Sequence, residues 1–147
     1  MTAKVFVDTN VLVYSRDASE PQKQEQAAAW MAHLWRTKTG RLSYQILQEY
    51  YITVTAKLQP GLDPESARQE IRALLAWRPI VLDDRVMENA WHVQDNFKVS
   101  WWDALVVSAA QLTDCRYLLT EDLQENQMFG SLRVTNPFKE QPAESTS

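Results

Sequence analysis

Short β-prone segments alternate with longer helical segments along this chain, and the alternation restricts the possible folds more than any other feature of the sequence. Apolar residues recur at helical spacing between the β-prone segments. Strands that are joined by helices form parallel sheets, and helices then cover both faces of the sheet. Five strands are predicted, over residues 5–7, 41–43, 79–83, 115–120 and 132–134. We therefore expect an α/β fold with a central, mostly parallel sheet of four to five strands.

Turn and cap residues mark the ends of the helical segments. Asp63 fits an N-cap and Pro64 the first helical position, a pairing typical of helix starts. Gly40 follows the first long helix and favours its end there. Five helices are expected, over residues 21–38, 45–58, 64–77, 84–97 and 100–112.

The length of 147 residues fits one domain with a substantial core. We expect that domain to span residues 1–138 and the polar residues 139–147 to form a flexible tail. No apolar stretch approaches the length of a membrane span, and the first residues lack a signal-peptide pattern. The expected location is cytoplasmic, without a membrane partner.

Charge and cysteine content exclude some classes of site. The single cysteine, Cys115, cannot form an internal disulfide, and neither it nor the two histidines show zinc-ligand spacing. The net charge of −4 is unlike that of a passive nucleic-acid binder, which usually has a basic face. A site of several carboxylates remains compatible with this charge, because bound metal ions would offset it.

Three acidic residues occupy positions that call for an explanation. Asp8 directly follows the first predicted strand and Asp122 follows the strand at 115–120. In open parallel sheets, ligands bind beyond the carboxyl ends of the strands. Asp103 is the only charged residue between Trp101 and Thr113, in an otherwise largely apolar helix. An unpaired charge buried there would be costly.

Asp8, Asp103 and Glu49 also have purely structural interpretations. Asp8 precedes Thr and Asn, a pattern common in turns and helix caps. Ser100 and Asp103 fit a capping box. Glu49 flanks the apolar stripe of its helix, where a glutamate is usually solvated. Glu121 is the nearest rival of Asp122 as a ligand.

Convergent carboxylates would perform metal-assisted chemistry. Oxygen ligands suit Mg²⁺ or Mn²⁺, and Mg²⁺ is commonly held by a few carboxylates together with substrate phosphates. One or two such ions can activate a water molecule and stabilise in-line displacement at phosphorus. Phosphodiester hydrolysis is the natural reaction of this kind of site.

Four segments of the chain resemble PIN-domain ribonucleases, and among them the toxins of VapBC-type toxin-antitoxin pairs. The segments are VFVDTNVLVYS from Val5, LSYQILQEYY from Leu42, SWWDALVVSAA from Ser100 and LLTEDLQ from Leu118. The resemblance implies a three-layer α/β/α sandwich and a metal-dependent endoribonuclease. It also implies an RNA substrate, a small antitoxin as partner and a homodimer.

Matched position by position, the resemblance assigns the four family acids to Asp8, Glu49, Asp103 and Asp122. These residues would be the catalytic set and would hold one or two Mg²⁺ or Mn²⁺ ions. Two neighbouring polar residues would support the ligands in a second shell, Asn10 and Thr120. One departure from the pattern is Asn126, where relatives lead us to expect a glycine, although asparagine tolerates a left-handed turn.

Other function classes fit the sequence less well. Phosphatases of the haloacid dehalogenase class need a D-x-D pattern after the first strand, and Asn10 replaces its second acid. With three glycines, the chain has neither a dinucleotide-binding fingerprint nor a P-loop. The serious alternative is a catalytically silent PIN-like RNA-binding or scaffold protein. Such a protein would normally lack one of the acids, and all four are present.

Overall fold

The computed structural model describes residues 3–142, and its sheet has five strands in the order β2-β1-β3-β5-β4. β1 pairs in parallel with β2 and β3, and β3 pairs in parallel with β5, whereas β4 is antiparallel to β5. The prediction of a mostly parallel sheet is therefore confirmed. The strands are β1 (Val5–Val7), β2 (Gly40–Arg41), β3 (Tyr117–Leu119), β4 (Met128–Phe129) and β5 (Leu132–Thr135).

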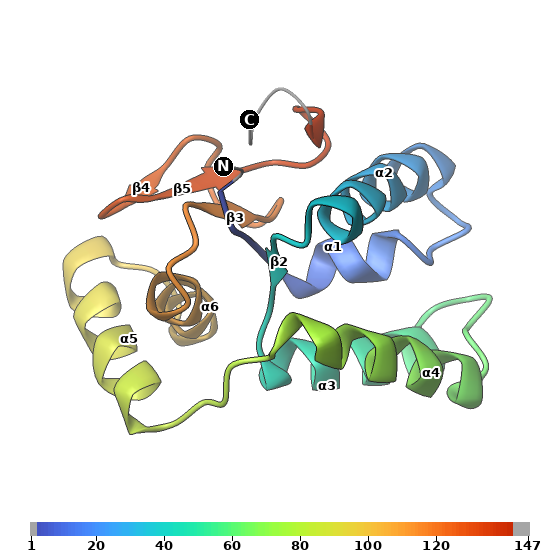
Figure 1. Cartoon of the computed structure of the whole chain (residues 1–147), viewed down its shortest axis with the longest axis horizontal. Helices are drawn as coiled ribbons and strands as arrows, with labels where there is room; N and C mark the ends of the chain where they lie inside the picture. Colours follow the sequence, from blue (N-terminus) through green and yellow to red (C-terminus); the bar gives the residue numbers. More distant parts are fainter. Residues whose placement is uncertain (1–2, 143–147) are drawn as a thin grey trace.

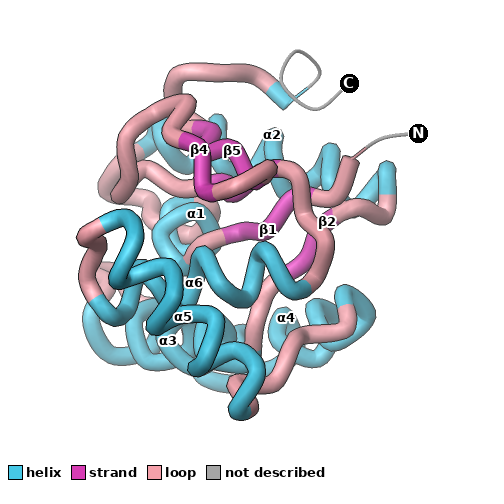
Figure 2. The backbone as a smooth tube through the Cα atoms, turned by 90° about the vertical axis from the view of Figure 1, so that its left-hand side faces the viewer, coloured by secondary structure: helices cyan, strands magenta, loops and turns pink. Residues whose placement is uncertain are grey.

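Helices cover both faces of this sheet, which gives the three-layer α/β architecture. Figure 1 shows α5 and α6 together on one side and α1 and α2 on the other, with α3 and α4 packed as a pair below β2. In the turned view of Figure 2, β1 and β2 lie among the helices, and β4 and β5 lie near the top of the molecule. The helices are α1 (Thr9–Tyr14), α2 (Pro21–Thr37), α3 (Tyr44–Ile52), α4 (Pro64–Leu74), α5 (Asp84–Phe97) and α6 (Trp101–Leu112). A π-helical turn, η1 (Thr53–Lys57), extends α3, and a 3₁₀ turn, η2 (Leu75–Trp77), extends α4.

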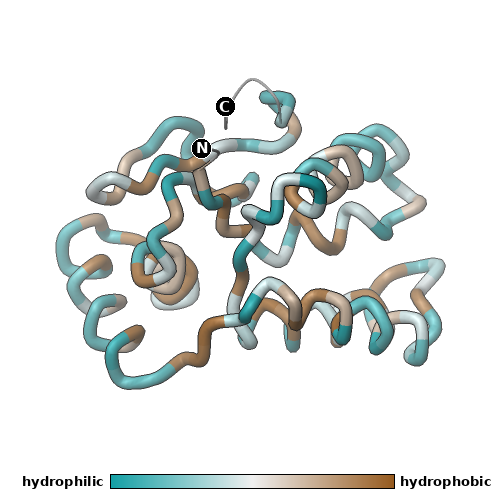
Figure 3. The backbone as a smooth tube through the Cα atoms, viewed as in Figure 1, coloured by the Kyte–Doolittle hydropathy of each residue, from teal (hydrophilic) through white to brown (hydrophobic). Residues whose placement is uncertain are grey.

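The core is one cluster of buried residues to which the central strands and all six helices contribute, with β1 and α6 buried most completely. All three residues of β1 are fully buried, and α6 is buried without interruption from Ala104 to Ala110. Figure 3 shows α6 as a largely hydrophobic segment. Because α6 packs between β3 and α5, it needs an apolar surface nearly all round, as its sequence provides.

The predicted helix starts are confirmed by their cap hydrogen bonds. The side chain of Asp63 accepts from the backbone N–H of Ser66 at 3.2 Å, and that of Ser100 accepts from Asp103 at 3.1 Å. These caps fix where α4 and α6 begin. Consequently, Asp103 lies in the first turn of α6.

One local prediction is wrong, and two elements were not predicted. Residues 79–83 do not form a strand; a single parallel bridge joins Ile80 to Ser43, because Pro79 has no N–H to donate and Val81 is 60% exposed. The apolar residues after Asp8 form α1, which the pattern of residues 9–14 did not reveal. The hairpin strand β4 was missed because it has only two residues.

Two further features bear on the expectations. Asn126 has φ of 67°, so asparagine does adopt the left-handed conformation that was expected at this position. Of the expected flexible tail, residues 143–147 lie outside the described residues, so its extent stays a prediction. Within residues 3–142, no helix combines the length and apolarity that a transmembrane segment requires.

Candidate active site

Asp8 lies at the carboxyl end of β1, where the central strands meet α1. Its backbone N–H donates to the carbonyl oxygen of Leu119 at 3.0 Å, which holds the ends of β1 and β3 together. One carboxylate oxygen, Oδ1, accepts from the backbone N–H of Thr9 at 2.8 Å and caps α1. The side chain is only 7% exposed. Asp8 is thus a helix cap and also a buried carboxylate at the edge where ligands bind.

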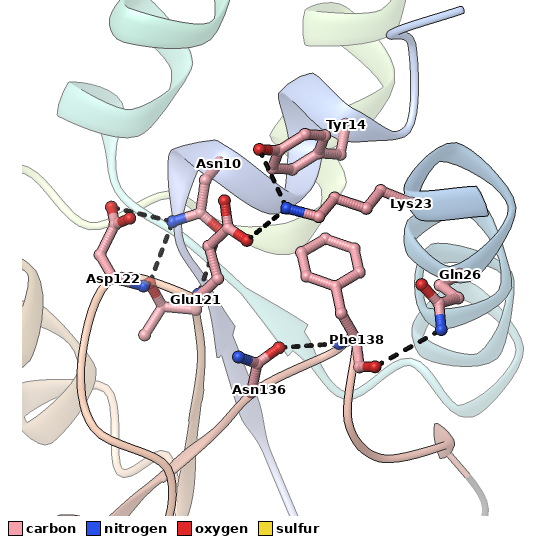
Figure 4. A network of polar contacts seen from close by, with 9 residues as sticks. Asn10, Tyr14, Lys23, Gln26, Glu121, Asp122, Asn136 and Phe138 are labelled. Atoms are coloured by element: carbon pink, nitrogen blue, oxygen red, sulfur yellow. Dashed lines mark hydrogen bonds and ion pairs between the residues drawn. The ribbon is translucent and has the colours of Figure 1, made fainter. Parts of the chain in front are cut away.

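Asn10 and Thr120 connect Asp8 to Asp122. The Thr120 hydroxyl donates to Asp8 Oδ2 at 2.9 Å, and it accepts from the backbone N–H of Asp122 at 3.1 Å. Asn10 Nδ2 lies 3.0 Å from the Thr120 oxygen and donates to Asp122 Oδ2 at 3.1 Å. Figure 4 shows Asn10 directed at Asp122 and the turn that carries it. Four of the six predicted site residues therefore form one hydrogen-bonded group.

Glu49 reaches this group through Thr9. Its Oε2 accepts from the Thr9 hydroxyl at 2.8 Å, and its Oε1 accepts from Gln45 at 2.9 Å. The side chain is solvent-exposed, as the structural interpretation expected. However, α1 and α3 pack against each other, and this contact brings Glu49 beside the residue that follows Asp8.

Asp103 is within electrostatic range of the same group. Partial burial raises the pKa of its carboxyl, the Ser100 hydroxyl lowers it, and repulsion from Asp122 raises it again. One half of the capping box is present, because the backbone N–H of Asp103 donates to the Ser100 hydroxyl at 3.1 Å. Its carboxylate in addition experiences the charge of the neighbouring acid.

Burial dominates the titration of Asp8. Desolvation raises the pKa of this carboxyl to about 6; the hydrogen bonds from Thr120 and Thr9 oppose the rise, whereas Asp122 and Asp103 add to it by repulsion. Within residues 3–142, none of the four acids has an ion-pair partner. Negative charge thus accumulates here without compensation from the protein.

Glu121, the rival of Asp122, is engaged elsewhere. Its Oε2 accepts from Lys23 Nζ at 3.0 Å, and Lys23 lies over the ring of Tyr14 at 4.6 Å from its centroid. Figure 4 shows this arrangement, with Phe138 on the other side of Lys23. The backbone N–H of Glu121 also donates to Asn10 Oδ1 at 3.3 Å. Glu121 therefore supports the turn, and Asp122 is the acid that faces the site.

A model of one protein family, the PIN domain, matches residues 5–127. The chain belongs to the PIN domain family. The match spans β1 to the turn before β4 and includes all four acids. No curated protein sequence matches the chain significantly.

Solved structures with the same fold support this assignment of the PIN domain. A toxin-antitoxin complex from Klebsiella pneumoniae aligns with a TM-score of 0.64 at 16% identity over 91% of this chain and 98% of that one. VapC20 of Mycobacterium tuberculosis, a Sarcin-Ricin loop cleaving toxin, gives 0.58 at 18% identity over 78% and 87%. VapBC2 from Rickettsia felis, bound to a promoter DNA fragment, gives 0.59 at 15% identity over 90% and 97%. At these identities the likeness concerns the fold alone.

The acidic group of this PIN domain fits a hard divalent cation by its chemistry. All the candidate ligand atoms are carboxylate oxygens, which Mg²⁺ and Mn²⁺ prefer. Within the described part of the chain, however, no three acidic, histidine or cysteine side chains are close enough to hold one ion as they stand. The acids repel one another and yet do not surround one point. Both observations can hold, because electrostatic repulsion acts over longer distances than a metal–oxygen bond of about 2.1 Å. The four candidate carboxylates are thus not yet gathered around one point, and Asn10 and Thr120 lie between Asp8 and Asp122.

Sequence reasoning missed two residues that organise the PIN-domain site. Thr9 holds Glu49, and Lys23 holds Glu121. A hydroxyl next to the first acid was a usable signal for Thr9. Nothing in the local pattern marks Lys23, because it reaches the site from α2 through a contact that joins residues 98 positions apart.

Proposed function

We propose that this PIN domain is an endoribonuclease that hydrolyses RNA phosphodiester bonds and depends on Mg²⁺ or Mn²⁺. One observation supports this most: Asp8 is a buried carboxylate with a pKa of about 6, next to two further acids and without a cationic partner in residues 3–142. Such a concentration of uncompensated charge destabilises a fold unless a ligand offsets it. A divalent cation is the ligand that carboxylates select.

Each residue has a role in this proposal. Asp8, Glu49, Asp103 and Asp122 would hold one or two ions, and a bound ion would activate a water molecule and polarise the scissile phosphate. Asn10 and Thr120 fix the carboxylates of Asp8 and Asp122 relative to each other through their hydrogen bonds. Above about pH 6, Asp8 is ionised and can act as a ligand.

We further propose that the protein is the toxin of a toxin-antitoxin pair, with a small antitoxin as inhibitor and a homodimer as its assembly. Three toxin or toxin-antitoxin structures share its fold along most of their length, which supports this assignment. Induced expression of the wild type should arrest growth of a bacterial host, and Asp8→Asn should not. If both induced cultures grew as fast as a culture without induction, the protein would not be a toxin.

The alternative function is a silent RNA-binding or scaffold protein. The open arrangement of the acids favours it, because no three of the described candidate ligands already surround one point. Against it stands the hydrogen-bonded order of Asp8, Asn10, Thr120 and Asp122. A scaffold protein would not need these side chains to be held in fixed positions by hydrogen bonds.

A cleavage assay separates the two functions. The purified protein is incubated with a mixture of structured and single-stranded RNAs in Mg²⁺, in Mn²⁺ and in EDTA. We expect cleavage with either metal, none in EDTA and none by Asp8→Asn, whereas the surface variant Glu88→Gln should cleave like the wild type. Robust cleavage by Asp8→Asn, or in EDTA, would refute the metal-centre proposal.

A further inference from the structure

A cavity of about 390 Å³ lies beside the amino-terminal end of β2. Asp8, in contrast, follows the carboxyl end of β1, and the two strands are parallel, so the cavity is at the opposite edge of the sheet. Its lining comes from the end of α2, from β2 and from the end of η2. The lining residues are Trp35, Lys38, Arg41, Ala76, Trp77 and Arg78.

Three of these residues are cations, although the whole chain has a net charge of −4. Within residues 3–142, Lys38, Arg41 and Arg78 form no ion pair with an acid. Among the described residues, Arg41 donates only to backbone carbonyls, at 2.7 Å to Gly40 and 3.4 Å to Lys38. The positive charge of the cavity is therefore uncompensated, in contrast to the surface arginines that pair with glutamates elsewhere.

Every polar side chain in the lining is a hydrogen-bond donor. Trp77 is 4% exposed, and its indole N–H, which has no acceptor in the described part of the chain, is buried and does not reach the cavity surface. The Trp35 ring packs against it, with centroids 5.2 Å apart, and is itself 40% exposed. A cavity lined by hydrogen-bond donors suits a ligand that carries hydrogen-bond acceptors. The exposed ring of Trp35 can stack on an aromatic group of such a ligand.

Helix capping explains part of this arrangement. Lys38 and Arg78 end α2 and η2 in the left-handed conformation, with φ of 60° and 55°, and cations are favourable at helix carboxyl ends. Capping does not account for Arg41. Lys98 ends α5 in the same conformation, with φ of 52°, and does not line the cavity. It is thus a matched control for charge and backbone.

We propose that this cavity binds one nucleotide unit of a single-stranded RNA, with the phosphate held by Lys38, Arg41 and Arg78 and the base stacked on Trp35. Guanidinium and ammonium groups are the usual protein partners of phosphate oxygens. Stacking on an exposed aromatic ring is tolerant of base identity. The site goes beyond the proposed nuclease activity and does not depend on it, because it shares no residue with the acidic group.

Binding of a fluorescein-labelled 12-nucleotide single-stranded RNA to the full chain, in EDTA and at several salt concentrations, tests this site. In the double variant Lys38→Gly/Arg78→Gly, glycine suits the left-handed backbone, so two charges are removed without added strain. We expect its affinity to fall roughly tenfold or more and the salt slope to fall by at most about 0.7, because the three cations share one phosphate. Lys98→Gly should stay within about twofold of the wild type and keep its slope.

Competition and a third variant identify the ligand. Trp35→Ala should weaken RNA binding and leave binding of inorganic phosphate unchanged. If AMP displaces the RNA, the cavity also binds free nucleotides. If AMP does not displace it, the cavity binds a nucleotide only as part of a strand. Either result supports the nucleotide site. Unchanged RNA affinity in the double variant, an equal loss in Lys98→Gly, or preferential binding of a heptaglutamate peptide would overturn it. Because the assay contains no metal and scores no cleavage, a failed nuclease assay would leave its result intact.

Discussion

At the residue scale, Asp8 combines two roles that the sequence presented as alternatives. It caps α1 through Oδ1 and presents Oδ2 to Thr120 and Asn10. A carboxylate has two oxygens, so capping and ligand roles need not exclude each other. The same holds for Asp103, whose backbone N–H satisfies the cap while its carboxylate is repelled by Asp122.

The titration of Asp8 predicts a pH-dependent stability in EDTA. Its pKa of about 6 in the folded chain lies above its ordinary value of 3.8, so folding favours the protonated form. This stabilisation is complete below about pH 4 and is lost as the pH rises through about 6, a total of roughly 3 kcal/mol. Asp8→Asn, which carries no charge, should therefore be more stable than the wild type at pH 8, and the difference should shrink toward pH 4. Chemical denaturation at each pH measures it, and a difference that is constant with pH would contradict this origin.

Asp103 yields a prediction that separates its two roles. Asp103→Asn removes one of the repelling charges and keeps the backbone N–H that Ser100 caps. We expect this variant to melt higher than the wild type in EDTA and to gain less from added Mg²⁺, since a saturating ligand stabilises only the chain that binds it. If Asp103 were a cap alone, the variant would melt lower, by the loss of about 0.3–1 kcal/mol of dipole interaction, and would keep the full response to Mg²⁺.

At the scale of elements, the predictable parts were those with strong periodicity and recognisable caps. α4 and α6 begin where Asp63 and Ser100 indicate, because each side chain accepts a hydrogen bond from the backbone N–H of the third residue beyond it. β4 could not be predicted, because two residues carry no periodicity and its pairing with β5 is tertiary. The strand prediction for residues 79–83 failed for a related reason. An apolar run shows that a segment is β-prone, but it does not show that a neighbouring strand is available for pairing.

The contact of Gly40 with Trp77 yields a prediction about β2. A Cβ at position 40 would lie 2.4 Å from the Trp77 ring, which is held in place by its burial. Gly40→Ala should therefore destabilise the fold by about 1–3 kcal/mol, as overpacked cores do. The matched change Gly61→Ala, in an exposed turn with its nearest contact at 3.1 Å, should cost less. Equal denaturation midpoints for both variants would show that Trp77 moves aside freely.

At the scale of the whole molecule, opposite charges collect at opposite edges of one parallel sheet. The acids follow the carboxyl ends of β1 and β3, and the basic cavity lies beside the amino-terminal end of β2. The alternation of strands and helices and the binding rule for parallel sheets made the acidic edge predictable from Asp8 and Asp122. The basic cavity was not predictable, because Lys38 and Arg78 lie 40 positions apart and meet only through the packing of Trp77 on Gly40.

The central claim, that four acids form one metal centre, is tested most directly by calorimetric titration of Mn²⁺ into the metal-free protein. We expect the wild type to bind one or two ions per chain and each amide variant, Asp8→Asn, Glu49→Gln, Asp103→Asn and Asp122→Asn, to bind at least about tenfold more weakly. Glu121→Gln should bind like the wild type, because Lys23 engages that carboxylate. Wild-type Mn²⁺ affinity in all four variants, or its loss in Glu121→Gln alone, would contradict the account.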